Sequence, residues 1–218
     1  MRKLFQAIRQ KDLDTVRQIL NKNPELISCT AKEPPKKDDG QSPLQVALKT
    51  GNFEIADFLL DIGANVNFIE DEACANTWRA PVLHDAINAS VMCSRWNTNN
   101  PVYGGFKVFS TKEKADQAYR ILEKMILLGA DVNAKDSYDN SPLWRFCLQA
   151  RQILPAYNHV EHRVSDNRIL TPELREDLSR IFLLLKANGA DMNDITSNCT
   201  LNIMGMYGEE PLGQILRL

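Results

Sequence analysis

The sequence predicts an all-α chain of stacked helix pairs, because two short patterns recur along it in the same order. The first pattern is Gly-Ala-Asn/Asp-Val/Met-Asn, at Gly63–Asn67, Gly129–Asn133 and Gly189–Asn193. Each copy follows a run with apolar residues at helical spacing, and a glycine there is a common helix stop. The second pattern places a proline and a leucine upstream, at Ser42–Ala47, Pro81–Ala86 and Ser141–Phe146. Such repetition is typical of a solenoid, in which each helix pair buries its apolar face against the next.

The proline-leucine segments predict where the first helix of each pair begins. Serine is a favoured N-cap and proline suits the first helical position, so Ser42-Pro43 and Ser141-Pro142 mark helix starts. Two further starts, of second helices, are expected at Ser110–Glu113, which has the sequence of a capping box, and at Thr171-Pro172. We expect the helices after these two starts to run to Leu128 and Asn188.

Charge is unevenly distributed along the 218 residues, although the net charge is only −2. Residues 1–37 hold nine basic and four acidic side chains, whereas residues 38–90 hold two basic and nine acidic ones. No large basic field is present to bind a phosphate backbone, which argues against nucleic acid as the main partner. The acidic segment would suit a basic protein partner, but a solvated acidic face is the favoured interpretation.

Membrane insertion and secretion are not indicated by the sequence. The longest apolar run is Ile181–Leu185, far short of the roughly 20 residues that a membrane helix needs. The N-terminus meets charge before an apolar core can form, so it does not resemble a signal peptide. The five cysteines are scattered and form no paired motif, which suggests reduced cysteines in a cytoplasmic protein.

The recurring segments resemble the ankyrin repeat, whose signature joins a TPLHxA-like segment to a helix pair ending in GADVN. Residues 40–67 match it most fully. The resemblance implies one domain over residues 1–218, an all-α ankyrin-repeat solenoid with β-hairpin-like loops and about five units. The approximate units are 1–30, 38–69, 78–136, 139–196 and 197–218, of which the first and last resemble shortened caps.

Two units depart from the repeat length by the same amount. Gln45 and Gly63 are 18 positions apart, whereas His84 and Gly129, and likewise Trp144 and Gly189, are 45 apart. The third and fourth units therefore carry inserts of 27 residues between their helices. Equal inserts in adjacent units suggest lengthened helices that pack on each other. Pro155 is expected to stop the first helix of the fourth unit.

Single residues also depart from the signature. His84 fits the signature histidine, which in the family hydrogen-bonds the backbone near the hairpin. Gln45 and Trp144 stand at that position in the second and fourth units, and Phe146 replaces the usual alanine. These departures weaken the match at single sites, and the bulky Phe146 suggests altered spacing between units three and four.

The resemblance implies a non-enzymatic scaffold that binds another protein through its hairpin tips and the concave face of its first helices. Transferred to this chain, the candidate contacts are Arg9, Gln10, Asp38, Asp39, Gln41, Lys49, Thr50, Trp78, Arg79, Asn88, Ser137, Tyr138, Asn140 and Gln149. Exposed Trp, Tyr and Arg dominate binding energy at interfaces, which favours Trp78, Arg79 and Tyr138. Solvated loop tips are the alternative interpretation.

The inserts form a second candidate surface, at the end of the stack opposite the hairpins. Trp96 in the first insert and Tyr157 in the second are its candidate contacts. For Phe106 and Phe109 we expect packing within the insert instead. An aromatic insert could also pair two copies, so the sequence leaves monomer and homodimer open.

Other functions are less favoured by the residues. The chain has no phosphate-binding glycine loop and no nucleophile elbow, and no cofactor is expected. An enzyme or metal site would have to use His159 and His162, whose spacing alone is weak evidence for metal. A toxin-neutralising immunity protein is a further alternative, since the acidic segment would suit a basic toxin.

Overall fold

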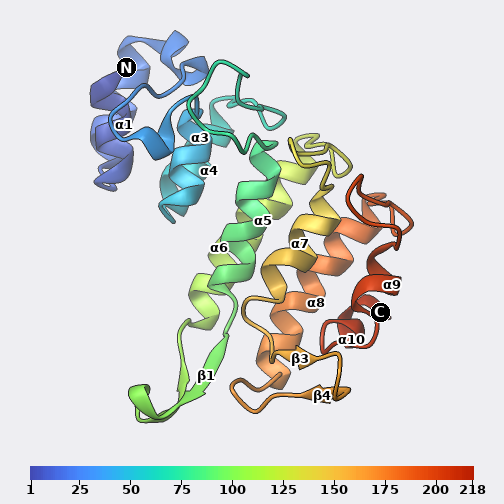
Figure 1. Cartoon of the computed structure of the whole chain (residues 1–218). Coiled ribbons are helices and arrows are strands. Elements are labelled where there is room, and N and C mark those ends of the chain that lie inside the picture. Colours follow the sequence, from blue (N-terminus) through green and yellow to red (C-terminus); the bar gives the residue numbers. More distant parts are fainter.

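The computed structural model describes residues 1–218 and contains ten α-helices that follow one another along a single stack (Figure 1). The N-terminal helices lie at one end of the stack and the C-terminal helices at the other. The helices are α1 (Arg2–Arg9), α2 (Leu13–Lys22), α3 (Pro43–Lys49), α4 (Phe53–Asp61), α5 (Val82–Cys93), α6 (Lys112–Leu127), α7 (Pro142–Ala150), α8 (Pro172–Ala187), α9 (Ile203–Tyr207) and α10 (Gly213–Leu216).

The helix starts follow the local sequence closely. Ser42 caps α3 in a capping box with Gln45, and Ser141 and Thr171 cap α7 and α8 ahead of a proline. The capping box expected at Ser110 is wrong, because Thr111 is the N-cap of α6. The Ser110 hydroxyl instead donates to the Cys93 carbonyl at 2.6 Å, which ties the end of α5 to the start of α6.

The second helices of two pairs, α6 and α8, are longer than α4, the second helix of an earlier pair. α6 and α8 each have 16 residues, whereas α4 has nine. The stop expected at Pro155 is misplaced, since α7 already ends at Ala150. A buried turn containing Ile153 and Leu154 follows it. Turn residues with apolar side chains continue the core here without continuing the helix.

One continuous hydrophobic core runs through the stack from Leu4 to Leu216. Phe146, which was expected to disturb the spacing of units, is completely buried within it. Its ring lies 6.2 Å from that of Phe182 on α8, measured between centroids. The larger side chain therefore fills space between α7 and α8, as close packing requires.

The strands lie where they were not expected. The loops that the resemblance predicts to be hairpin-like contain no strand, although the N–H of Ala31 donates to the Gln41 carbonyl at 2.8 Å. Two small antiparallel sheets instead occupy the segments between α5 and α6 and between α7 and α8. Their strands are β1 (Asn97–Asn100), β2 (Gly105–Val108), β3 (Tyr157–Asn158) and β4 (Arg163–Val164).

The two strand-bearing segments contact each other through hydrogen bonds. The Asn97 amide donates to the carbonyl of Ile169 at 2.7 Å and accepts from its N–H at 2.8 Å. The N–H of Asn99 donates to the Asn167 carbonyl at 2.8 Å. Paired bonds of this kind fix the position of one segment relative to the other.

The turn between α1 and α2 gives a testable strain effect. Lys11 has φ +61°, and it stands where the next helix pair has Gly51, with φ +67°. A side chain in the left-handed region costs roughly 1–2 kcal/mol. We therefore expect Lys11→Gly to raise the free energy of unfolding by about 0.5–1 kcal/mol, after the added freedom of the unfolded chain is subtracted. Urea denaturation measures this, and Gly51→Ala should shift stability in the opposite direction.

Candidate protein-binding surface

The loops at one end of the stack are held by side chains from the first helices. His84 on α5 lies with its Nε2 3.1 Å from the Ala134 carbonyl, and Trp144 on α7 donates its Nε1 to the Asp194 carbonyl at the same distance. Gln45 on α3 donates to the Glu70 carboxylate at 2.9 Å. These residues occupy equivalent helix positions, so Trp144 and Gln45 perform the linking role expected of the signature histidine.

Asparagines add a second set of links between successive loops. The Asn67 amide donates to the Gly129 carbonyl at 2.9 Å and accepts from the Asp131 N–H at 2.8 Å. Asn133 makes the same pair of bonds to Gly189 and Asp191, at 2.9 and 3.0 Å. Each loop is therefore positioned by its neighbour, and the row of loops forms a fixed surface.

Trp78 is held on this surface by three residues from different segments. Its Nε1 donates to the Asp136 carboxylate at 2.9 Å. The Arg145 guanidinium on α7 lies 4.7 Å from the ring centroid, and the Lys49 ammonium on α3 lies 5.5 Å from it. Cations over an indole ring are attracted by its electron-rich face. The ring is thereby fixed in orientation while remaining half-buried.

Asp136 organises the loop next to Trp78. Arg145 donates to its carboxylate at 2.7 Å, and the main-chain N–H groups of Tyr138 and Asn140 donate at 2.9 and 3.0 Å. Burial raises the pKa of Asp136, but the hydrogen bonds from Trp78, Asn140 and Arg145 outweigh it and hold the pKa below its usual value. A buried carboxylate thus fixes the loop in one shape.

The two loops that meet at Trp78 are also joined directly. The N–H of Arg79 donates to the Ser137 hydroxyl at 3.1 Å, and the N–H of Ser137 donates to the Arg79 carbonyl at 2.9 Å. Tyr138 follows Ser137, and 51% of its surface is exposed. We name the surface formed by Lys49, Trp78, Arg79, Ser137, Tyr138 and Arg145 the Trp78–Tyr138 surface.

A group of buried carboxylates lies between α3 and α5 beneath this surface. Gln45 donates its single amide nitrogen to Glu70 at 2.9 Å and to Asp85 at 3.2 Å, and both acids are buried. The Lys49 ammonium is 3.8 Å from Asp85. Burial, aided by the negative charge of Glu70, raises the pKa of Asp85 to about 7 despite the opposing charge of Lys49.

This shift predicts a pH dependence of stability. The pKa of Asp85 is about 7 in the folded chain, above its ordinary value of 3.8. The unfolded chain therefore loses this proton first, and the folded state loses up to about 4 kcal/mol of stability from this group as the pH rises from 4 to 7. We expect Asp85→Asn to melt at a higher temperature than the natural chain at pH 8, with the gain shrinking towards pH 4.

Asp85→Asn must be compared with the natural chain at each pH, because His84 changes the stability of both chains in the opposite direction as the pH rises. Burial lowers the pKa of His84 to about 4, although the charge of Asp136 opposes the shift. Its contribution to stability is complete above pH 6.5 and is lost as the pH falls towards 4. If the melting temperatures of the two chains differ by the same amount at every pH from 4 to 8, the raised pKa of Asp85 is contradicted.

Comparison with known families assigns the repeats. A family model described as ankyrin repeats (3 copies) matches residues 4–95. Residues 4–95 of the chain are ankyrin repeats. Ankyrin repeats generally mediate protein–protein interactions and are typically without enzymatic activity. No curated protein sequence matches the chain. None of its helices has both the length and the hydropathy to cross a membrane.

Some ankyrin-loop residues that we expected to contact a partner are not accessible. Asp38 and Gln41 are buried, with 4% and 1% of their surface exposed, so they are wrong as contacts. Arg9 turns inward and pairs with Asp38 at 2.7 Å, which satisfies both charges. Asp39 accepts from the N–H of Ala75 at 2.8 Å. These side chains hold the first loop against its neighbour.

The remaining candidate contacts differ in whether their side chains are exposed and without hydrogen bonds inside the chain. Gln10 is exposed, whereas the Thr50 hydroxyl is occupied by a bond of 2.6 Å to the Val46 carbonyl. Asn140 donates its amide to Asp136 at 3.1 Å and serves the loop. Asn88 and Gln149 are half-buried on the first helices α5 and α7. Their availability to a partner stays a prediction.

Sequence reasoning missed two residues of the Trp78–Tyr138 surface or its support. Arg145 follows Trp144 on α7, and it was hidden because the signature comparison looks at positions 144 and 146. Asp136 was overlooked because an acidic residue in a loop is usually solvated. A useful signal was available, since a loop aspartate commonly accepts from the main-chain N–H two residues on, which here is that of Tyr138.

Of the two phenylalanines that we expected to pack within the first strand-bearing segment, only one does so. Phe109 stacks on Trp96, with ring centroids 4.2 Å apart and planes 11° apart, so both pack within the segment. Phe106 is 50% exposed, and its expected packing is wrong. It lies on a projecting strand, where no other part of the chain can cover it.

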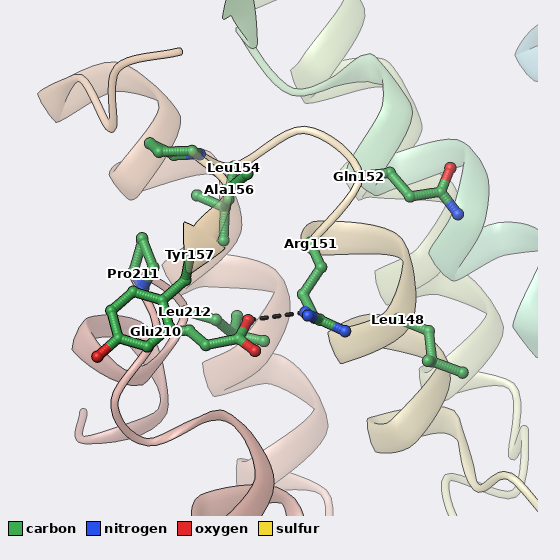
Figure 2. A pocket seen from close by; sticks show the side chains of 10 residues that line it. Leu148, Arg151, Gln152, Leu154, Ala156, Tyr157, Glu210, Pro211 and Leu212 are labelled. Atoms are coloured by element: carbon green, nitrogen blue, oxygen red, sulfur yellow. Dashed lines mark hydrogen bonds and ion pairs between the residues drawn. The ribbon is translucent and has the colours of Figure 1, made fainter. Parts of the chain in front are cut away.

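The second segment forms a pocket of about 290 Å³ with α7 and the loop between α9 and α10 (Figure 2). Tyr157, Leu212 and Pro211 lie on one side of it and Arg151 on the other. Arg151 donates to the buried Glu210 at 2.7 Å, which neutralises the charge in the pocket.

The two histidines of this segment lie beside different glutamates. The His159 imidazole is 3.1 Å from Glu210, and that of His162 is 3.7 Å from Glu209. No group of three or more His, Cys, Asp or Glu side chains is placed to hold a metal ion. The geometry thus gives the metal-site alternative no support.

Proposed function

We propose that this ankyrin-repeat protein is a non-enzymatic scaffold that binds a protein partner on the Trp78–Tyr138 surface. The observation that carries the proposal is the arrangement of Trp78 and Tyr138 on two loops that hydrogen-bond to each other. Trp, Tyr and Arg are the side chains that contribute most to binding energy when an interface covers them. Here they come from the loops that follow the second helices and from the first helices, the two regions through which ankyrin repeats bind partners.

The rigidity of this surface supports the proposal. The Trp78 ring is fixed by Asp136, Arg145 and Lys49, so little side-chain freedom remains to be lost on binding. Binding to ordered side chains avoids roughly 0.5–1.5 kcal/mol for each one already immobilised. Tyr138 contributes apolar area without a side-chain partner of its own.

The charge of the partner follows from the acids that stay exposed. Three of the nine acidic residues in 38–90 are buried, namely Asp38, Glu70 and Asp85, so the acidic surface is smaller than the count suggests. Asp71 and Glu72 remain exposed in the loop that precedes Trp78. We propose that they receive basic side chains at the rim of the partner.

The domain organisation that we propose is one platform of about five helix pairs over residues 1–218. The two segments between paired helices act as the inserts of the third and fourth units. Support comes from the order of the helices and from the continuous core. The free state of all five cysteines supports a reducing compartment, and we propose the cytoplasm.

Affinity capture with matched variants tests the binding surface. The full chain, tagged, is exposed to lysate of its own cells beside two single variants, Tyr138→Ala and Leu127→Ala. Leu127 is 80% exposed at the C-terminal end of α6, outside the two loops that carry Trp78 and Tyr138, and serves as the control. We expect a protein that is retained by the natural chain and by Leu127→Ala and is lost by Tyr138→Ala.

The alternatives have no specific observation in their favour. The toxin-neutralising reading and the enzyme or metal reading both lack support from the family match. Retention of the same partner by Tyr138→Ala and by a second variant, Arg79→Ala, would overturn the surface that we propose.

A further inference from the structure

The hairpin of β1 and β2 projects from the stack, and its two edges differ (Figure 1). The edge of β1 is covered, since Asn99 and Asn97 bond to the second segment at Asn167 and Ile169. Along β2, Phe106, Lys107 and Val108 are all exposed. Only the outer edge of β2 therefore faces solvent.

The hydrogen-bond register shows which groups of β2 point outward. The N–H of Phe109 donates to the Trp96 carbonyl at 2.9 Å, and Asn97 pairs with Val108 and Asn99 with Phe106. Alternate residues of an antiparallel ladder face the neighbouring strand. The main-chain groups of Phe106 and Val108 therefore point away from β1, where they meet no main-chain partner. Such an edge is a template for another strand.

The side chains of β2 define what that strand should carry. Phe106 and Val108 are 50% and 46% exposed on one face. Lys107, on the other face, is the only charged residue among 96–111. Its ammonium lies 5.3 Å from the Phe109 ring centroid and 5.8 Å from that of Tyr103, and no carboxylate pairs with it. An acidic side chain across from Lys107 would supply the missing charge.

We propose that the β2 edge binds an extended segment of a partner protein, which adds a third antiparallel strand with an acidic side chain between two apolar ones. This deepens the proposed protein-binding function and uses a surface separate from the Trp78–Tyr138 surface. A second copy of the chain is a poor occupant. The two-fold pairing that uses both Phe106 and Val108 would set Lys107 opposite itself, and like charges there are destabilising.

Nuclear magnetic resonance on the isotope-labelled full chain tests the proposal. The probe is the synthetic peptide acetyl-Thr-Val-Glu-Val-Thr-amide, with a matched peptide in which lysine replaces glutamate. We expect saturable shifts and slowed amide exchange at Phe106 and Val108, with about threefold weaker binding of the lysine peptide. Lys107→Glu should invert the preference between the two peptides.

Two variants separate strand addition from loss of the hairpin. Val108→Pro removes an outward N–H that the ladder does not use, so the hairpin should persist and peptide binding should be lost. Val108→Thr keeps this N–H and should still bind. Cross-strand contacts between Asn99 and Phe106 report whether the hairpin remains folded.

Several results would overturn the strand-addition proposal. These are the absence of shifts at Phe106 and Val108, slow exchange of their amides without peptide, equal binding by Val108→Pro, or a dimer of the free chain that involves β2. None of them affects the Trp78–Tyr138 surface, whose test depends on Tyr138→Ala. If the Tyr138→Ala test fails, the prediction of peptide binding at β2 is likewise unaffected.

Discussion

Replacing Asp177 with alanine should lower the free energy of unfolding by about 3–5 kcal/mol. Asp177 on α8 is buried, with 1% of its side chain exposed, and it accepts from Arg95 at the end of α5. The main-chain N–H and the Nε of Arg95 both donate to it at 2.9 Å, and the Nη2 donates at 2.8 Å. These bonds raise the pKa of Arg95 above its usual range. Truncation would leave the main-chain N–H of Arg95 unpaired and its guanidinium without its buried partner, with only the exposed Glu176 as a counter-charge.

The neighbouring acid provides a matched control for Asp177. Glu176 also accepts from Arg95 at 2.8 Å, but 63% of its side chain is exposed. An exposed ion pair contributes about 0–1 kcal/mol, so Glu176→Ala should change stability little. Chemical denaturation of both variants measures the difference. Equal small losses would contradict the view that Asp177 anchors Arg95 to α8.

Replacing Asp136 with alanine should cost a similar amount, about 3–5 kcal/mol, and should also disorder the Trp78–Tyr138 surface. The side chain of Asp136 is fully buried and accepts from Trp78, Arg145 and Asn140. Its removal leaves the Arg145 guanidinium and the Trp78 N–H unpaired. It also releases the main-chain N–H groups that shape the loop.

A graded series distinguishes loss of the charge from loss of the acceptor. Asp136→Asn keeps an oxygen for the loop but loses the pairing with Arg145, so we expect an intermediate loss of stability. Asn140→Ala removes a single donor and should cost about 1 kcal/mol. Denaturation together with the nuclear magnetic resonance signal of the Trp78 indole N–H would follow both effects. A loss for Asp136→Ala no larger than that for Asn140→Ala would argue against Asp136 as the organising residue.

The sequence predicted the helices because their signals are local. The capping Ser42 with Gln45, and Pro142 and Pro172 at first helical positions, act on the main chain within one turn. The bond from His84 to a loop carbonyl was expected from the resemblance to the repeat signature. Trp144 was placed at the same signature position, but it was not predicted to make the equivalent bond, which its indole N–H donates to the Asp194 carbonyl.

The strands and several site residues depend on contacts distant in sequence. The segment Asn97–Asn100 is polar and has no alternation, so strand propensity gives no signal there. It is an extended strand because β2 and the main chain near Ile169 bond to it. Asp38 was expected at the surface, and its burial depends on Arg9, which lies 29 positions earlier. Patterns within one repeat do not contain such pairings.

The most direct test of partner binding at the Trp78–Tyr138 surface is amide hydrogen exchange of the full chain, alone and with its captured partner. We predict slower exchange at residues 77–80 and 136–140 in the complex, with no change at the C-terminal ends of α6 and α8. These loops carry Trp78 and Tyr138 and already hydrogen-bond to each other. Unchanged exchange in both loops, with protection confined to α6 and α8, would contradict the account.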